Sequence, residues 1–290
     1  ILTADGDSPG LNAAIRAFGK AAIGQYGYKV TGFLDGFHGL KMNNSVEMVK
    51  SDFSGILTSG GTMLGTSREK INDLDPLKKT IAEHGLDGLV CFGGSATQKF
   101  ALRLKQEGIN VITLPKSITN HIAGTDNCIG FDSALTIAAE SIDRLHTTAH
   151  SHHRIIVVEI MGEDSGWLAL GAGITGGADV ILIPEIPYDV SSVAKAIQER
   201  SSKGKRFSLV AVSQGAISEE DNRFFSKAHQ VNEYLRGGRK EFKEVENQLV
   251  EIEEDFTGKS IDLAQRLSSA TNIETRITIL GFLQRGGSPT

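Results

Sequence analysis

The sequence predicts an α/β fold in which mainly parallel sheets are flanked by helices. Short runs of β-branched and aromatic residues alternate with helical stretches along the whole chain, which is the pattern of βαβ units. Glycines stand where these strands are expected to end, for example at Gly6, Gly60, Gly93, Gly162 and Gly286. The carboxyl ends of parallel strands meet at one edge of a sheet, so these turns predict a ligand crevice there.

Each element is expected where the local pattern is strongest. The runs rich in β-branched and aromatic residues predict strands at Ile1–Ala4, Tyr28–Leu34, Gly88–Gly93, Asn110–Leu114, Arg154–Ile160, Val180–Ile183, Phe207–Val212 and Arg276–Leu283. The stretches between them predict helices at Asn12–Gly24, Ala96–Gln106, Ser133–His146, Ser191–Ser202 and Ile261–Ala270. Residues 222–256 are charged and helix-prone, which predicts a helical excursion on the surface. Trp167 stands near an expected helix start and is interpreted as a core residue.

Two domains are predicted from the organisation of the chain. A boundary is expected near Gly130–Ala134, and the chain is expected to return to the first domain around Gly286. The first domain then comprises residues 1–132 with a return segment at 284–290, and the second comprises residues 133–283.

Composition narrows the class of partner. Thirty basic against thirty-five acidic side chains give a formal net charge of -5, so no overall positive field favours nucleic acid or an anionic membrane. The two cysteines, Cys91 and Cys128, are far apart in the sequence, which argues against a disulfide framework or a zinc site. No apolar run approaches the roughly 18 residues of a membrane span. We therefore expect a cytoplasmic protein with a small-molecule partner.

The glycine turns also indicate the chemistry of that partner. Glycine permits positive φ and lets backbone N–H groups approach an anion closely, and a helix N-terminus adds positive potential. One turn continues from Gly65 through Thr66 and Ser67 to Arg68, which supply hydroxyl groups and a cation. This combination predicts phosphate binding.

Several motifs, taken in order, cover nearly the whole chain. They lie at Thr3–Arg16, Ser59–Arg68, Phe92–Gln98, Leu114–Asp126, Ser151–Gly162, Gly176–Glu185 and Ile279–Pro289. Together they resemble the phosphofructokinase family. The resemblance implies the two-domain phosphofructokinase fold, a dimer or tetramer, and transfer of a phosphoryl group from ATP or pyrophosphate to fructose 6-phosphate with Mg²⁺. It implies that residues 1–132 form the donor side and residues 133–283 the sugar-phosphate side.

The resemblance also assigns site residues. The donor phosphates are expected at Asp5, Gly6, Arg68, Gly94, Ser95, Ala96 and Thr97. The sugar phosphate is expected at Ser117, Arg154, Met161, Gly162, Gln214, Arg276, Phe282 and Arg285. Thr119 stands in the position of the family's catalytic base, and Lys116 is expected to act beside it. The alternative role for Arg154, Arg276 and Arg285 is that of structural ion-pair partners, which the resemblance makes the weaker interpretation.

The departures from the family concern the chemical step. Thr119 and His121 stand where the family carries two aspartates, and Ser95 stands where an aspartate or asparagine is usual. Threonine cannot accept a proton near neutral pH, and loss of a general base typically costs about 10²–10⁴ in rate. Serine and histidine are poor substitutes for the carboxylate ligands of Mg²⁺. The sequence therefore predicts no metal ligand at the usual positions. It supports the binding of Mg²⁺ and of the phosphoryl donor less well than the family's usual residues do.

Other replacements affect the binding groups. Asp5 replaces a glycine near the donor phosphates, Gln214 replaces a glutamate, and Phe282 replaces a histidine. Lys116 is usual in the pyrophosphate-using branch, whereas Ala96 lacks the acidic residue that usually accompanies it there. The choice between ATP and pyrophosphate stays open on the sequence alone.

These observations leave two main hypotheses. The first is a non-catalytic or impaired homologue that binds fructose 6-phosphate or a similar sugar phosphate and assembles with itself or with an active paralogue. The second is an active phosphotransferase that makes fructose 1,6-bisphosphate with a rearranged base and metal site, for which Asp5, Glu163 and Asp164 are the available carboxylates. A dinucleotide-dependent oxidoreductase is disfavoured because no G-x-G-x-x-G turn is followed by an acidic residue about 20 positions later.

Overall fold

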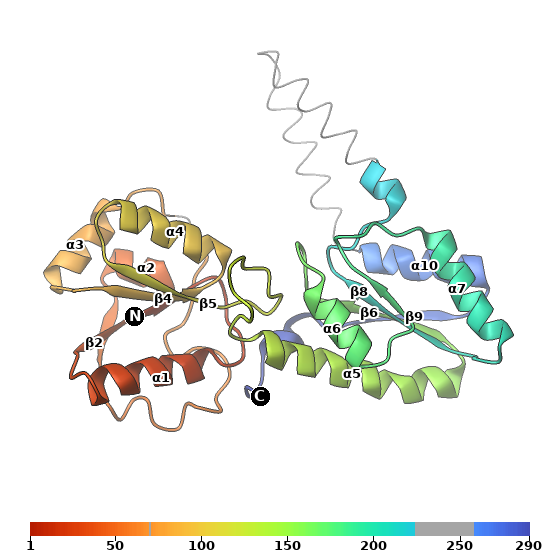
Figure 1. Ribbon diagram of the computed structural model, residues 1–290, viewed down its shortest axis with the longest axis horizontal. Coiled ribbons are helices and arrows are strands. Elements are labelled where there is room, and N and C mark those ends of the chain that lie inside the picture. Colours follow the sequence, from red (N-terminus) through yellow and green to blue (C-terminus); the bar gives the residue numbers. More distant parts are fainter. Residues whose placement is uncertain (70, 224–257) are drawn as a thin grey trace, which may run out of the picture. The chain divides into compact units, whose positions relative to one another are not determined.

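The computed structural model describes residues 1–69, 71–223 and 258–290. The chain divides into two compact units, both visible in Figure 1. Unit 1 comprises Ile1–Ile137 and Phe282–Thr290, and unit 2 comprises Ala138–Gly281. Most of the excursion expected at residues 222–256, with its glycine pair at 237 and 238, lies outside the described residues.

Unit 1 is built on a parallel sheet with the strand order β1-β4-β5. Its strands are β1 (Leu2–Thr3), β4 (Leu89–Gly93) and β5 (Val111–Pro115). Helices α1 (Leu11–Gly24) and α4 (Ser95–Gln106) lie on opposite faces of this sheet (Figure 1). The other elements of unit 1 are β2 (Val30–Phe33), α2 (Gly36–Met42), β3 (Ser45–Met48), α3 (Asp75–Glu83) and the short 3-10 helix η1 (Gly281–Arg285), which begins at the last residue of unit 2.

The core of unit 1 lies on both faces of the sheet. One cluster of buried side chains contains Leu2, Leu89 and Leu104, and the other contains Leu11 and Phe92. Burying each such side chain contributes about 1.5–3 kcal/mol. Strand β4 thus contributes to both clusters, and the carboxyl ends of β1 and β4 lead into the glycine turns at Gly6 and Gly94.

Unit 2 contains a second parallel sheet, with the strand order β7-β8-β6-β9. Its strands are β6 (Ile155–Ile160), β7 (Val180–Leu182), β8 (Ser208–Ser213) and β9 (Thr275–Ile279). Helices α7 (Val190–Ser202) and α10 (Lys259–Thr271) cover one face, and α5 (Phe131–His152) and α6 (Trp167–Thr175) cover the other (Figure 1). Alternate residues of each strand face opposite sides, so Val157 and Val210 pack against α7 and α10.

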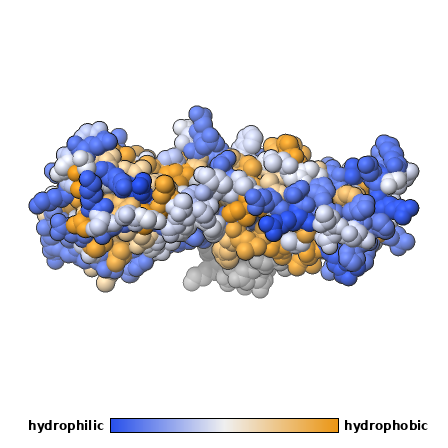
Figure 2. Space-filling model, turned by 90° about the horizontal axis from the view of Figure 1, so that it is seen from below, coloured by the Kyte–Doolittle hydropathy of each residue, from blue (hydrophilic) through white to orange (hydrophobic). Residues whose placement is uncertain are grey.

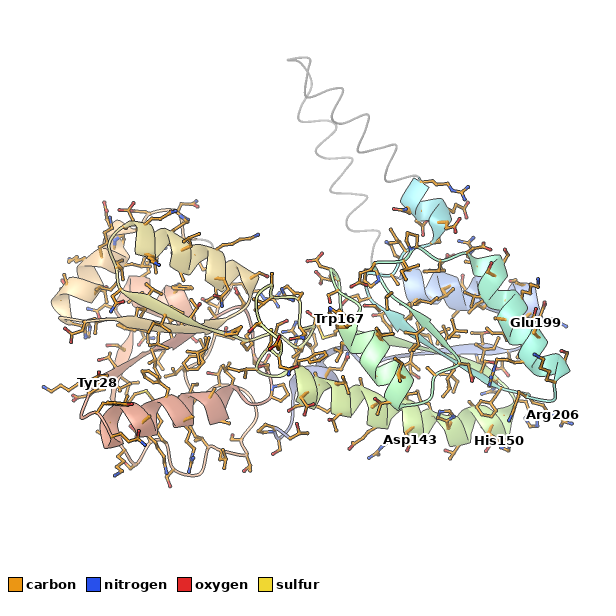
Figure 3. All side chains as sticks on the ribbon, viewed as in Figure 1. Tyr28, Asp143, His150, Trp167, Glu199 and Arg206 are labelled. Carbon is orange, nitrogen blue, oxygen red and sulfur yellow. The ribbon has the colours of Figure 1, made fainter. Side chains whose placement is uncertain are left out.

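Several expectations about individual elements need correction. The strand expected at Arg276–Leu283 ends at Ile279, because Gly281 has φ of +48° and the chain turns into η1. The elements α2, β3 and α3 were not predicted, and α6 was expected only as a helix start near Trp167. Trp167 is 56% exposed rather than buried, because it projects from the first residue of α6 (Figure 3).

The surface is mixed in character. Hydrophobic side chains reach it among hydrophilic ones on the face seen in Figure 2, and the exposed ones include Tyr26, Ile174, Ile186 and Phe282. Among the described helices, none combines the length and the apolar character needed to cross a membrane.

Candidate functional site

The turn that follows β1 lies against two guanidinium groups. Gly6 has φ of +82°, and its backbone N–H donates a hydrogen bond to Thr66 Oγ1 at 3.1 Å. A Cβ atom at Gly6 would lie 3.0 Å from Arg285 Nη1 and 3.5 Å from Arg68 Nη2. Glycine permits this close approach of side chains to the backbone, so the turn, Arg68 and Arg285 form one site.

Lys116, the residue after β5, belongs to the same site. It is 3% exposed, and its Nζ donates a hydrogen bond to the backbone oxygen of Asp5 at 2.7 Å. Burial lowers the pKa of Lys116 to about 8; the charges of Arg285 and Arg68 act in the same direction, whereas Asp5 and Asp7 oppose it. We call Arg68, Lys116 and Arg285 the cation cluster.

The cation cluster is suited to an anion with several charged oxygens. Guanidinium groups bind phosphate oxygens through paired N–H donors, and a lysine adds a compact charge. The resemblance assigned Arg68 to the donor and Arg285 to the sugar phosphate. The structure brings the two arginines to the same glycine turn, so either phosphate group would meet both of them.

Asp5 occupies the N-terminus of α4. Its Oδ2 accepts hydrogen bonds from Thr97 N at 2.8 Å and from Thr97 Oγ1 at 2.6 Å. Negative charge is stabilised at a helix N-terminus. Asp5 has φ of +61°, in the left-handed region where a non-glycine residue is strained. A Cβ atom at Gly94 would lie 3.3 Å from the same Oδ2, so the carboxylate fills the space beside this turn.

A second cluster consists of hydroxyl groups around one imidazole. His121 Nδ1 lies 2.7 Å from Thr119 Oγ1 and 3.0 Å from Ser117 Oγ, and His121 Nε2 lies 2.7 Å from Ser95 Oγ. Thr119 N donates a hydrogen bond to Ser117 Oγ at 3.2 Å. We call Ser95, Ser117, Thr119 and His121 the imidazole cluster. It joins the start of α4 to the loop after β5 and contains Ser95, Thr119 and His121, which the resemblance matches to the family's base and metal carboxylates.

The residues at those positions do not fit a magnesium ion. Mg²⁺ prefers carboxylate and phosphate oxygens, whereas Ser95, Ala96 and His121 offer no carboxylate. Within residues 1–69, 71–223 and 258–290 there is no group of three His, Cys, Asp or Glu side chains that could hold a metal ion. The three carboxylates that the sequence offers for a rearranged metal site are divided between the units: Asp5 lies in unit 1, and Glu163 and Asp164 lie in unit 2.

The predicted sugar-phosphate residues of unit 2 fall into two sets. Met161, Gly162 and Gln214 follow the carboxyl ends of β6 and β8. Gly162 has φ of +151°, and its backbone oxygen accepts hydrogen bonds from Ser213 Oγ at 2.7 Å and Gly215 N at 2.8 Å. The two loops are therefore tied together at this edge of the sheet.

Arg154 and Arg276 lie at the opposite edge, where β6 and β9 begin. Arg154 Nε and Arg276 Nη2 contact the two carboxylate oxygens of Glu274, at 2.8 Å and 2.5 Å respectively. β6 spans six residues, which at about 3.3 Å per residue separates the two edges by roughly 20 Å. The structure therefore brings the two arginines together but places them far from Gly162 and Gln214 of the same chain.

Phe282 and Ala96 lie at the margins of the unit 1 site. Phe282 is 80% exposed, and its ring centroid lies 6.0 Å from Arg285 Cζ, which is cation–π distance. Ala96 is exposed in the first turn of α4. Phe282 therefore faces the cation cluster through Arg285 and supplies no titratable group there.

The structure adds two groups that sequence reasoning did not assign. Glu274 was overlooked, although it stands two residues before Arg276 and such residues share one face of a strand. For His121, the sequence predicts only the absence of the aspartate that the family carries at this position. The short sequence separation of His121 from Thr119 and Ser117 indicates that these side chains can contact one another. The contact between His121 and Ser95 could not be inferred in this way, because it joins two segments that are far apart in the sequence.

Comparison with known proteins covers the whole chain. The sequence model of a family described as "Phosphofructokinase" matches residues 1–290. The chain is 49% identical to an ATP-dependent 6-phosphofructokinase of Propionibacterium freudenreichii, over 100% of this chain and 80% of that protein. It is 43% identical to ATP-dependent 6-phosphofructokinase 3 of Bacteroides thetaiotaomicron, over 100% of this chain and 79% of that protein.

Solved structures agree with the sequence comparison. A phosphofructokinase from Saccharomyces cerevisiae superposes with a TM-score of 0.79 at 30% identity, covering 100% of this chain and 38% of that one. A pyrophosphate-dependent phosphofructokinase from Marinobacter aquaeolei gives a TM-score of 0.76 over 98% of this chain and 68% of that one. At 20% identity, this second similarity concerns the fold alone.

Proposed function

Because the chain belongs to the phosphofructokinase family, we propose that it transfers the terminal phosphoryl group of ATP to fructose 6-phosphate and forms fructose 1,6-bisphosphate. The observation that carries the proposal is the convergence of Arg68, Lys116 and Arg285 on the Gly6 turn. Relatives at 49% and 43% identity bear the names of ATP-dependent enzymes, which favours ATP over pyrophosphate as the donor.

The cation cluster supports this chemistry for an electrostatic reason. Phosphoryl transfer depends mainly on positioning and on stabilising the charge of the transferring group. Fixed cations in a partly buried site stabilise that charge without reorganising during the reaction. Lys116 is held in place by its hydrogen bond to the Asp5 backbone, and both guanidinium groups lie against the turn that would contact the donor.

A magnesium ion normally supplies part of this stabilisation in the family. It would cancel phosphate charge and orient the donor when bound. The chain offers no carboxylate at the family's metal positions, so we assign no residue to the metal. The charge stabilisation that we assign to the chain comes from its own three cations.

The position of Arg154 and Arg276 supports assembly of the chain with a second copy. Both arginines lie at the edge of the unit 2 sheet opposite Gly162 and Gln214, roughly 20 Å away along β6. One sugar phosphate cannot contact both sets in one chain, whereas two copies of the chain could each contribute one set. We therefore propose a homo-oligomer in which Arg154 and Arg276 serve the site of a neighbouring copy.

The missing carboxylates favour a second candidate function. Thr119 and Ser95 cannot act as a base or as strong metal ligands, so the chain would bind the sugar phosphate without turnover. The two candidates share the binding groups and differ only in the chemical step. Their separation therefore requires binding and turnover to be measured on the same preparation.

A coupled assay for fructose 1,6-bisphosphate, with ATP and separately with pyrophosphate, tests the proposal. We expect turnover with ATP that is lost in Arg285→Met, while Arg223→Met, an exposed arginine paired with Glu219, serves as the matched control. Thermal unfolding with fructose 6-phosphate reports binding independently. Stabilisation by the sugar phosphate without any turnover would overturn the proposal and establish the non-catalytic candidate.

A further inference from the structure

The imidazole cluster offers a proton acceptor that neither the family nor the sequence pattern assigns. Thr119 stands in the position of the base, and its Oγ1 lies 2.7 Å from His121 Nδ1. Imidazole is the side chain that accepts and releases a proton near neutral pH. We propose that His121 accepts the proton of the sugar hydroxyl through Thr119 Oγ1, an inference that rests on the proposed function.

The contacts of the ring accommodate a tautomer suited to this role. When Nδ1 accepts a hydrogen bond from Thr119 Oγ1, the neutral ring carries its proton on Nε2. Nε2 then donates to Ser95 Oγ, which lies 2.7 Å away. Ser95 thereby positions the ring and stabilises the imidazolium that forms, although it is a poor metal ligand.

Ser117 keeps Thr119 in the orientation that the relay needs. Ser117 Oγ accepts a hydrogen bond from Thr119 N at 3.2 Å and lies 3.0 Å from His121 Nδ1. It also lies 3.2 Å from Thr119 Oγ1. The backbone and side chain of Thr119 are therefore both held beside the imidazole.

The step balances without a further reactant. The O–H bond of the sugar hydroxyl breaks, and its proton passes to Thr119 Oγ1 while the proton of Oγ1 passes to the lone pair of His121 Nδ1. The sugar oxygen forms the new bond to the terminal phosphorus of ATP, and the electron pair of the breaking P–O bond leaves with ADP. His121 is exposed, so the imidazolium returns its proton to solvent.

Chemical rescue is the sharpest test. In the ATP-dependent assay, His121→Ala is expected to lower kcat about 10²-fold, the low end of the effect of a lost base, with KM for fructose 6-phosphate changed less than about threefold. Added imidazole is expected to restore part of kcat, because the exposed position admits a small molecule. His152→Ala, which removes an exposed histidine at the end of α5, is the matched control and should show neither effect.

Variants of Thr119 separate the relay from a merely structural role. Thr119→Ser keeps the hydroxyl and is expected to retain kcat within about fivefold, whereas Thr119→Ala is expected to lose about as much as His121→Ala. The double variant should be no slower than either single variant, because residues that act as one unit are not additive. Thermal unfolding of each variant shows that the fold is kept.

The outcomes distinguish this inference from the proposed function. Unchanged kcat in His121→Ala, or a loss that imidazole does not rescue while the fold is kept, overturns the relay and leaves the phosphotransferase standing. Absence of turnover in the unaltered chain overturns both. Additive losses in the double variant also overturn the relay, because they show that Thr119 and His121 act separately.

Discussion

The two units hold their cationic side chains in different ways. In unit 1 the like charges of Arg68, Lys116 and Arg285 are crowded closely enough that the arginines help to lower the pKa of the lysine. In unit 2, Arg154 and Arg276 share the carboxylate of Glu274. Crowded cations gain the most favourable interaction energy when an anion binds, because its negative charge relieves the repulsion between them. A shared carboxylate orients its arginines but competes with any incoming anion.

Restoring carboxylates in unit 1 is expected to produce the largest gain in turnover. The triple variant Ser95→Asp, Thr119→Asp and His121→Asp places a direct base and two metal ligands beside the cation cluster. We expect kcat of the ATP-dependent reaction to rise about 10-fold or more, because a carboxylate at position 119 accepts the proton directly instead of through Thr119 and His121, and the other two carboxylates suit Mg²⁺. Steady-state kinetics with fructose 6-phosphate checks this. A gain of this size would mean that the three carboxylates are the main groups that unit 1 lacks for efficient phosphoryl transfer.

The matched control carries asparagine at the same three positions. Asparagine has the size of aspartate but neither accepts a proton nor carries a charge, so it should bring no gain. A folded aspartate variant that still binds fructose 6-phosphate but is no faster than the asparagine variant would contradict the interpretation. The defect of unit 1 would then extend beyond its carboxylates.

Removing one arginine from each unit tests the comparison directly. Arg285→Met is expected to weaken pyrophosphate binding, measured by calorimetry, about 10- to 100-fold, since hydrogen bonds to charged groups contribute about 1.5–3 kcal/mol. Arg276→Met is expected to change the same affinity less than about twofold, because it lies in unit 2 beside Glu274. Equal losses of pyrophosphate affinity in both variants would mean that the arginines of the two units act on the same ligand.

The pKa of Lys116 predicts opposite effects of pH on stability and on binding. Between its folded pKa of about 8 and the ordinary value of 10.5, the unfolded chain holds the proton that the folded chain has lost. Stability therefore rises with pH across this window, by at most about 3 kcal/mol. Affinity for pyrophosphate should fall about 10-fold over the same window as the cation is neutralised.

Lys116→Met isolates this contribution. It removes the titration but keeps an unbranched side chain of similar length in the buried position. Denaturant unfolding and calorimetry at pH 7 and pH 10 should show a smaller difference between the two pH values in the variant than in the unaltered chain. Identical pH profiles would show that Lys116 keeps its charge throughout the range.

Parallel strands and amphipathic helices could be predicted from the sequence because their periodicity is local. Two of the elements whose ranges were not predicted, α2 and α6, contain glycine that serves packing rather than turning. In α6, a Cβ atom at Gly173 would lie 2.8 Å from Ile181 side-chain atoms, so glycine lets the helix approach the sheet. In α2, a Cβ atom at Gly39 would lie 1.6 Å from Leu34 O. Neither close approach is visible in a single sequence.

The arrangement of the candidate site could not be predicted from the local sequence. The resemblance to the family pointed to Arg68, Lys116 and Arg285, yet their meeting at one turn depends on how the C-terminal segment returns to unit 1. The resemblance assigned Arg154, Arg276 and Gly162 to one sugar-phosphate site, whereas the strand direction places the two arginines at the other edge of the sheet. The bond between His121 and Ser95 joins two loops and has no counterpart in local sequence.

The smallest expected effect comes from the carboxylate that distinguishes unit 2. Glu274→Gln keeps the shape of the side chain but removes the negative charge that Arg154 and Arg276 share. We expect fructose 6-phosphate to bind about 2- to 5-fold more tightly, because it no longer competes with a fixed anion. Stability should fall by no more than about 1 kcal/mol, the usual worth of an exposed ion pair.

The control for this variant is Glu219→Gln, which removes one partner of the exposed pair with Arg223. It should cost a similar small amount of stability and leave sugar-phosphate affinity unchanged. Thermal unfolding with increasing fructose 6-phosphate measures both quantities on one instrument. Weaker binding in Glu274→Gln would show that the carboxylate orients the arginines more than it competes with the ligand, and the contrast between the two units would then rest on preorganisation rather than on charge.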